Sequence, residues 1–567
     1  MEKQIYGDDK RIKQLIDEHE VISFDIFDTL LMRKTLIPHD VFRIVEKRVN
    51  YALQHTYSFF DARVKAELDL IARIPNIYEL YDEIRKTLEI TECEARRILE
   101  LELAVEHEML GPRNGMVKVF NYAIEKGKTV NIVSDTHIPK KVLEGWLDGF
   151  GVRNYNQFYV SCEYHKSKAT GIFEEYRSNY KDQKCLHIGD SVIYDGEMAE
   201  KYGIDAYIID SAKYMLEKTN LICLEKYESD FSNRCAIGLL INTLFTNPFS
   251  SVDQNGLVQL GSLEDLAILS VAPILSDFVF WISEQMKEQN LETIILSARD
   301  GYLLDKMMLR ITGGVAYNHK YILFSRVAGN VMTINEKEDF RQSMRRPREM
   351  SFSDCIRQRL EIDGSTVEEE RFFDLNKDKI QSQSMKFREK YLSYIKNEGI
   401  DLDKRIGFFD FVSSGTCHQL YNKISGNNAV GLYFYRYDRS RKDRSELVVK
   451  SYLTDEEGQK FWKNYKFFET VLTSSKPCFL RIDSDGKKIF EDEKRSETQL
   501  SLLEKQQKMI LQYFETIQRM YIGRIDKELL LDMADFISKE NIVLNDVRKA
   551  DLYLYDNFEG GKIDAFS

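Results

Sequence analysis

The sequence has little that would suit it to nucleic acid, disulfides or zinc. Its 80 Lys and Arg residues are outnumbered by 92 Asp and Glu, which gives a formal net charge of −12. A general nucleic-acid binder needs clustered positive charge against the phosphate backbone, so we expect no nucleic-acid partner. The 8 cysteines are scattered and form no Cys-x-x-Cys pair. This pattern argues against a disulfide framework and against a zinc ribbon.

Long apolar runs are also missing. The most apolar segment, Leu266 to Ile282, is interrupted by Pro273 and Asp277 and is shorter than the ~20 residues that a membrane span requires. Its flanks hold few basic residues for anionic lipid, so we expect a buried packing helix. The first ten residues, MEKQIYGDDK, lack the apolar stretch of a signal peptide. We therefore expect a cytoplasmic protein with no membrane span.

Proline and glycine are scarce, with 8 and 29 residues among 567, which is typical of long regular elements. Hydrophobic residues make up 43% of the chain and charged residues 30%, a globular rather than a disordered composition. At roughly 100–200 residues per domain, the length allows two or three domains.

An α/β domain with a parallel sheet is predicted up to about residue 225. Four apolar runs that end in Asp, Ser or Gly alternate there with helical patterns: VISF at 21–24, TVNIV at 129–133, CLHI at 185–188 and DAYII at 205–209. Between the first two runs, Val41, Val45 and Val49 share a helical face, and Thr91 with Glu94 forms a capping box. We therefore predict a helical insertion over about 31–112.

Three further regions follow. Residues 226–262 are mixed in composition and are predicted to be a linker. A second Rossmann-like α/β domain is predicted over 263–490, with strands at 293–296, 321–324, 406–409 and 431–435. Leu503, Ile510 and Phe514 recur at helical spacing, so residues 491–567 are predicted to be a helical C-terminal region.

Chemically suitable side chains follow the strands of the first domain. A carboxylate such as Asp25 can attack phosphorus and form an acyl-phosphate. Asp25 and Asp190, at neighbouring strand ends, can share Mg²⁺, which favours carboxylate oxygens. Ser134 can hydrogen-bond a phosphoryl oxygen, and Lys168 can neutralise the developing charge.

Several nearby residues have simpler interpretations. Lys166 is the alternative to Lys168, which we favour because it lies just ahead of the helical GIFEEY. Asp135 and His137 are expected to be solvated or hydrogen-bonded loop residues beside Ser134. His187 lies inside an apolar strand and is expected to be a satisfied core histidine.

Taken together, FDIFDTLL and the later segments around Ser134, Lys168 and Asp190 resemble the four ordered motifs of the haloacid dehalogenase (HAD) superfamily of hydrolases and phosphatases. The resemblance implies a Rossmann-like core with a helical cap. It implies Asp25 as nucleophile, Ser134 as phosphoryl ligand and Lys168 as charge stabiliser. It also implies a Mg²⁺ site formed by Asp25, the Phe27 backbone carbonyl, Asp190 and Asp195.

The string FDIFDTLL, followed by an Arg and a PHDVF helix, is similar to a subgroup of large two-domain HAD proteins. In that subgroup a second α/β domain follows the HAD domain, often in polysaccharide-biosynthesis settings. The resemblance therefore implies a phosphomonoesterase that acts on a small phosphorylated metabolite, such as a sugar phosphate, through an aspartyl-phosphate.

The first motif departs from the family pattern at Phe27. HAD phosphatases carry a second Asp there, which protonates the leaving oxygen, and losing a general acid–base costs a factor of ~10² to 10⁴. Asp28 would point elsewhere if the strand geometry continued, and it can simply cap the following turn. Three alternatives stay open. The protein can act on a substrate with a good leaving group or on a carbon–halogen bond, or Asp28 or a cap residue can supply the proton. The third alternative is that the domain binds a phosphorylated ligand with little turnover.

The second domain offers weaker signals. Hydroxyls and glycine before the helix CHQLYNKI, with arginines at neighbouring strand ends, can form an anion site or can merely cap helices. The SSGT loop is faintly similar to the phosphate loop of phosphoribosyltransferases but lacks its paired acidic residues. The alternative functions are thus a transferase acting on an activated sugar or ribose phosphate, or a degenerate HAD binding module. The ligand candidates are Arg299, Asp300, Arg326, Asp410, Ser413, Ser414 and Thr416.

Overall fold

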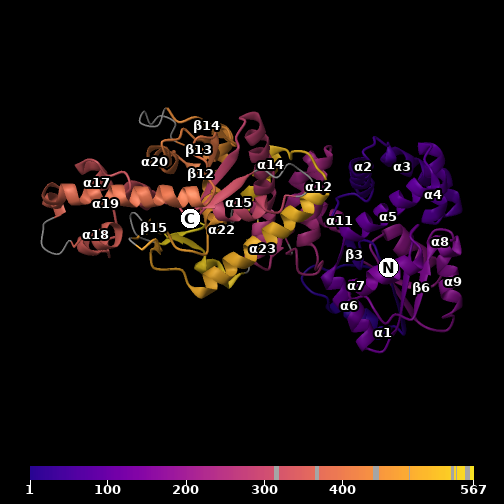
Figure 1. Cartoon of the computed structure of the whole chain (residues 1–567). Coiled ribbons are helices and arrows are strands. Elements are labelled where there is room, and N and C mark those ends of the chain that lie inside the picture. The colour runs from indigo at the N-terminus through magenta and orange to yellow at the C-terminus, as the bar shows by residue number, and fades with distance from the viewer. Residues whose placement is uncertain are drawn as a thin grey trace. The chain divides into compact units, whose positions relative to one another are not determined.

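The computed structural model of the chain divides into two compact units, each built around its own parallel sheet (Figure 1). The first unit comprises Met1–Gly261, Met520–Leu529 and Lys539–Asn545, and the second comprises Ser262–Arg519, Leu530–Ser538 and Asp546–Ser567. The structure describes residues 1–253, 255–311, 318–363, 369–437, 446–483, 485–537, 542–544, 546–555 and 562–566.

The sheet of the first unit contains the four predicted strands, which are buried as expected for a sheet covered on both faces. All its pairs are parallel. The chain leaves β2 for β5 and β6 on one side, then returns to β7 and β8 on the other. The strand order is β1 (Glu2–Lys3), β8 (Asp205–Ile208), β7 (Cys185–Gly189), β2 (Val21–Phe24), β5 (Thr129–Ser134) and β6 (Gln157–Val160).

Helices cover both faces of this sheet. Because side chains alternate along a strand, Ile22 and Phe24 of β2 join one hydrophobic cluster and Val21 joins another. The first cluster packs against α1 (Lys10–Glu18), α6 (Asn114–Glu125) and α7 (Lys140–Gly149). The second packs against α9 (Ile172–Ser178) and α10 (Met198–Lys201). The first unit is therefore a three-layered α/β fold, as predicted.

The predicted helical insertion is closed at its base by two short strands. β3 (Leu31–Arg33) pairs antiparallel with β4 (Leu110–Pro112), and four helices lie between them. The last helix begins at the predicted capping box, in which Thr91 and Glu94 bond to each other's backbone N–H groups. The helices are α2 (Asp40–Leu53), α3 (Phe59–Leu70), α4 (Ile77–Leu88) and α5 (Glu92–Met109).

The segment predicted as a linker, 226–262, is instead part of the first unit. It contains α12 (Phe231–Leu244), most of whose side chains are buried. Gly238 lets this helix approach the backbone at Thr35, because a Cβ on Gly238 would lie 2.8 Å from the Thr35 Cα. The apolar run CAIGLLINTL was the signal for a buried helix, and the turn-like NPFSSVDQNG follows only after it ends.

The second unit contains a five-stranded sheet that is parallel throughout, in agreement with the predicted second α/β domain. From β10 the chain first moves to β11 on one side and then crosses to β12 on the other. The strand order is β11 (His319–Ile322), β10 (Thr293–Ser297), β12 (Ile406–Ser413), β13 (Val430–Arg436) and β14 (Val449–Ser451).

The apolar segment predicted to be a packing helix starts at the end of α13 (Leu263–Leu266), continues through a π-helical turn, Ala267–Val271, and ends inside α14 (Ala272–Glu288). The longer stretch Leu263–Glu288 passes a length and composition test for a membrane span, but 83% of its most apolar window is buried inside the protein. Asp277, in the middle of α14, is fully buried and accepts a hydrogen bond of 2.7 Å from the Tyr452 hydroxyl. This burial is what a core helix of a soluble protein shows.

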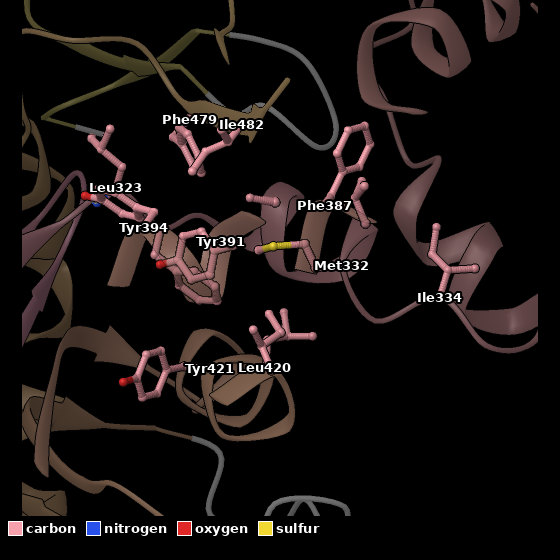
Figure 2. Packing of buried hydrophobic residues seen from close by; sticks show 14 of the residues in the cluster. Leu323, Met332, Ile334, Phe387, Tyr391, Tyr394, Leu420, Tyr421, Phe479 and Ile482 are labelled. Carbon is pink, nitrogen blue, oxygen red and sulfur yellow. The ribbon is translucent and has the colours of Figure 1, made fainter. Parts of the chain in front are cut away.

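A large aromatic cluster supports the sheet of the second unit. Figure 2 shows Tyr391 of α19 (Glu369–Asn397), Tyr421 of α20 (Thr416–Ser425) and Phe479 of β15 (Phe479–Ile482) gathered in it. α19 extends beyond the sheet, with α17 (Lys337–Ser343) and α18 (Phe352–Leu360) on either side of it (Figure 1).

The C-terminal region is only partly helical. α23 (Glu497–Arg519) buries Leu503, Ile510 and Phe514 as the spacing predicts, and α24 (Lys527–Asp535) follows. Beyond these helices, the described residues form a 3₁₀ helix, Val547–Asp551, and three short strands: β17 (Val543–Leu544), β18 (Tyr553–Tyr555) and β19 (Lys562–Asp564).

Gly238→Ala should lower the free energy of unfolding by about 1–3 kcal/mol, because the added methyl group would overpack the contact with residue 35. Gly145→Ala, in α7, is the matched control: nothing lies within 4 Å of its added Cβ, and it should gain about 0.5–1 kcal/mol from helix propensity. Urea denaturation of both variants measures the difference. Equal effects would mean that α12 is not packed in this way.

Candidate active site

Three carboxylates meet at the carboxyl edge of the first sheet. Oxygens of Asp25, Asp190 and Asp195 all lie within 4.8 Å of one another. Strand pairing brings the first two together, because Phe24 of β2 is in register with Ile188 of β7, and the Asp25 N–H donates to the Ile188 carbonyl at 2.9 Å. The site therefore lies where the strand order reverses, between β2 and β7, as ligand sites of open α/β sheets do.

Asp195 is held by the turn that follows β7. It lies in a π-helix, Val192–Glu197, a conformation that is frequent at functional sites. Its Oδ2 accepts a hydrogen bond of 2.9 Å from the Ser191 N–H. Gly189 leaves space for this arrangement, because a Cβ there would lie 2.5 Å from the Asp195 Cβ.

Lys168 is the only lysine or arginine that forms an ion pair with this cluster among the residues the structure describes. Its Nζ lies 2.8 Å from Asp25 Oδ1 and 2.5 Å from Asp195 Oδ1, and its side chain is 4% exposed. Burial lowers the pKa of Lys168, but Asp195, Asp25 and Asp135 outweigh this and hold the pKa above its ordinary value. Lys166, the alternative, pairs instead with Glu175 at 2.5 Å.

The carboxylates are electrostatically strained as a group. Burial raises the pKa of Asp25 and that of Asp190, and for Asp190 the neighbouring carboxylates Asp28, Asp195 and Asp25 raise it further. Burial also acts on Asp195, but Lys168 and His187 overcome it and lower the pKa of that carboxyl. One buried ammonium cannot neutralise three carboxylates. The donor set therefore fits a hard divalent cation such as Mg²⁺.

Ser134 ends β5, the strand beside β2, and is fully buried. Within the described part of the chain its hydroxyl has no hydrogen-bond partner. Buried hydroxyls are normally satisfied, so an orphaned one beside an acidic cluster fits the predicted role of binding a ligand oxygen.

The backbone after Asp25 departs from strand geometry, which changes the expectation for Asp28. β2 ends at Phe24, and Asp28 has φ 55°. The Asp28 carboxylate is among the charges that raise the pKa of Asp190. Burial also raises the pKa of Asp28, although Arg33 and Arg113 oppose this.

Phe27 lies at the boundary between the site and the helical insertion. The Arg33 guanidinium lies 4.2 Å from the centre of the Phe27 ring, and Arg33 pairs with Glu106 of α5 at 2.7 Å. The Phe27 backbone carbonyl stays a predicted metal ligand.

The structure gives specific partners to three further residues near the site, one in β7 and two in loops. His187 is buried and bridges Ser23 Oγ at 2.8 Å and Asp195 Oδ1 at 2.9 Å. It is a satisfied core histidine, as expected, but its partner is an acid of the site. Asp135 accepts the Lys168 backbone N–H at 3.0 Å, and His137 bonds the Pro75 carbonyl at 2.8 Å. Asp135 therefore helps to position Lys168, and His187 helps to position Asp195.

Most candidates in the second unit line one cavity of about 440 Å³. Thr416, which begins α20, is not among the lining residues. The sequence did not identify Tyr437, Tyr465 and Glu469, which also line the cavity. The predicted residues that it brings together are Arg299, Asp300, Arg326, Asp410, Ser413 and Ser414.

Comparisons with known proteins give fold neighbours only. No protein-family model and no curated protein matches the sequence. Among solved structures, the candidate HAD hydrolase YfnB of Bacillus subtilis, bound to magnesium, is 13% identical; the match covers 35% of this chain and 97% of that chain, with a TM-score of 0.27. A HAD phosphatase from Thermococcus onnurineus is 18% identical; the match covers 35% of this chain and 96% of that chain, with a TM-score of 0.25.

Asp190→Asn should raise the unfolding temperature of the metal-free protein, because it removes a charge that burial and neighbouring carboxylates disfavour. The same variant should lose most of the stabilisation that millimolar Mg²⁺ gives the wild type. Thermal unfolding with and without Mg²⁺ measures both effects.

The exposed Asp182→Asn is the matched control and should leave both quantities unchanged. If Mg²⁺ raised the unfolding temperature of Asp190→Asn as much as that of the wild type, Asp190 would not be a ligand of the ion.

Proposed function

We propose that the first unit, which has a HAD-like fold, is a Mg²⁺-dependent phosphatase that acts on a small phosphorylated metabolite such as a sugar phosphate. The observation that carries the proposal is the Lys168 ammonium, 2.8 Å from Asp25 and 2.5 Å from Asp195, beside the third carboxylate of Asp190. This arrangement supports a nucleophile that is anionic and yet able to approach a phosphate dianion.

In the proposed reaction, an Asp25 oxygen attacks the phosphorus. The bond between phosphorus and the leaving oxygen breaks, and an aspartyl-phosphate forms, which water then hydrolyses. Lys168 offsets the charge that gathers on the transferred group, and the Ser134 hydroxyl donates to one of its oxygens. Asp25, Asp190, Asp195 and the Phe27 carbonyl would hold Mg²⁺, which would neutralise further charge when bound.

The leaving oxygen needs a proton that Phe27 cannot give. We assign this role to Asp28. Burial raises its pKa, and a carboxyl with a raised pKa is suited to general acid catalysis. The positive φ of Asp28 supports this assignment. In a regular strand, side chains alternate between the two faces, and this alternation would have turned Asp28 away from the site.

The choice of a small phosphorylated metabolite as substrate follows from the resemblance of the sequence motifs to those of the HAD phosphatases. We further propose a cytoplasmic role, in the polysaccharide-biosynthesis setting that the sequence resemblance implies.

Asp25→Asn should abolish phosphate release from a panel of phosphorylated metabolites assayed with Mg²⁺, because an amide cannot form the acyl-phosphate. Asp182→Asn should keep wild-type activity, and circular dichroism should show that both variants are folded. Phosphate release by Asp25→Asn at the wild-type rate would refute the assigned nucleophile.

Asp28→Asn should reduce kcat about 10²- to 10⁴-fold for an alkyl phosphate, whose leaving group needs a proton. Its effect on an aryl phosphate with an acidic leaving group should be much smaller. Steady-state rates with both substrate types test the assignment, and equal losses would point to a different proton donor. Adding Phe27→Asp to the Asp28→Asn variant should restore the rate with the alkyl phosphate, because the new carboxyl would take over the proton transfer.

A further inference from the structure

The cavity of about 440 Å³ in the second unit has the size and the position of a ligand site. The five strands run in the order β11, β10, β12, β13, β14, so the chain reverses its direction of travel between β10 and β12. Arg299 and Asp300 follow β10, and Asp410 and Ser413 lie at the end of β12. The cavity therefore opens at the switch point, where open α/β sheets bind their ligands.

Three charged side chains of this cavity have no close polar contact within the described part of the chain. Among the residues that the structure describes, the Arg299, Asp300 and Glu469 side chains form no hydrogen bond and no ion pair within 4.0 Å. One oxygen of Asp410 is buried and likewise has no hydrogen-bond partner there. Charged groups that are partly removed from water are normally paired, so their common lining of one cavity is typical of a site for a polar ligand.

The positive groups suit a phosphoryl oxygen. Arg299 and Arg326 come from the ends of neighbouring strands, and guanidinium groups bind phosphate in a bidentate manner. Cys417, in the first turn of the ten-residue helix α20, also lines the cavity, and no side chain caps this helix. Its first backbone N–H groups therefore add donors for an anion.

The carboxyl groups exclude simpler ligands. Asp300, Asp410 and Glu469 would repel an inorganic anion. Among the described residues, the carboxylates of this cavity do not have the spacing of a metal site, unlike those around Asp25. Carboxyl groups bind sugar hydroxyls well, both as acceptors and, when protonated, as donors. Burial raises the pKa of Asp410 to about 6 and that of Glu469 to about 8, which allows both behaviours near neutral pH.

The rest of the lining offers a firm, partly aromatic surface. Phe479 belongs to the buried cluster in Figure 2 and also lines the cavity, so the core fixes one wall. Tyr437 and Tyr465 also line the cavity, and both pack against Trp462, with ring centres 5.4 and 4.9 Å away. Such rings pack against the apolar face of a sugar or a base.

We propose that this cavity binds a phosphorylated sugar, with Arg299 and Arg326 on the phosphoryl oxygens and with Asp410 and Glu469 on the hydroxyls. The sugar phosphate can be free or part of a nucleoside diphosphate sugar. This site is separate from the one at Asp25 and does not depend on phosphatase activity there.

Isothermal titration of the full chain with hexose phosphates and nucleoside diphosphate hexoses tests the proposal, with inorganic phosphate and the neutral hexoses as comparators. We expect saturable binding of at least one phosphorylated sugar that is at least tenfold tighter than that of inorganic phosphate. Arg299→Gln should weaken it at least tenfold, whereas the exposed Arg357→Gln should leave it unchanged. Whichever binds more tightly, the hexose phosphates or the nucleoside diphosphate hexoses, identifies the form of sugar phosphate that the cavity takes.

Asp410→Asn, which keeps the size of the side chain, serves if Arg299→Gln does not fold. It should weaken binding of the phosphorylated sugar at least fivefold without weakening binding of inorganic phosphate. The proposal is overturned if no phosphorylated sugar binds, if both cavity variants bind like the wild type, or if Asp25→Asn abolishes the binding.

Discussion

A single buried ammonium group holds the first site together. Two carboxylates contact Lys168 directly, and a third lies within 4.8 Å of both. Without a compensating charge, such a cluster could not stay ionised away from water. The surrounding structure preserves this arrangement: the register of β2 with β7 aligns Asp25 and Asp190, and Ser191 and His187 fix Asp195. The fold thus maintains an excess of negative charge that a bound cation would neutralise.

The two units place different chemistry at the same topological position. In each, the polar side chains gather where the strand order reverses, because the crossover helices lie on opposite faces there and leave the strand ends open. The first unit has an acidic cluster with one lysine, which favours a metal ion and a phosphoryl group. The second mixes arginines with carboxyl groups, which favours a ligand that is both anionic and hydroxylated. The shared architecture therefore sets the location of each site, and the side chains set its chemistry.

Much of this could be predicted from the sequence, because a buried parallel strand is a continuous apolar run whose end is marked by the residues that bind ligands. Asp25, Ser134 and Asp190 were placed correctly at strand ends for this reason. The predicted linker failed because one turn-like stretch hid the buried helix α12 before it. Asp28 required knowledge of where β2 stops, and Glu469 reaches its cavity from α22 (Tyr465–Leu472), a helix far along the chain. Such contacts depend on tertiary packing, which local patterns do not encode.

The first unit is discontinuous in the sequence. β17 adds to β9 (Gln259–Leu260), with the Val543 N–H donating to the Val258 carbonyl at 2.9 Å, and the Asp526 N–H donates to Asn233 at 2.9 Å. A ribosome therefore makes almost the entire second unit before the first can acquire its last strand. A recombinant fragment that stops at Gly261 would lack these pieces, so a single cut there does not divide the protein into two complete halves.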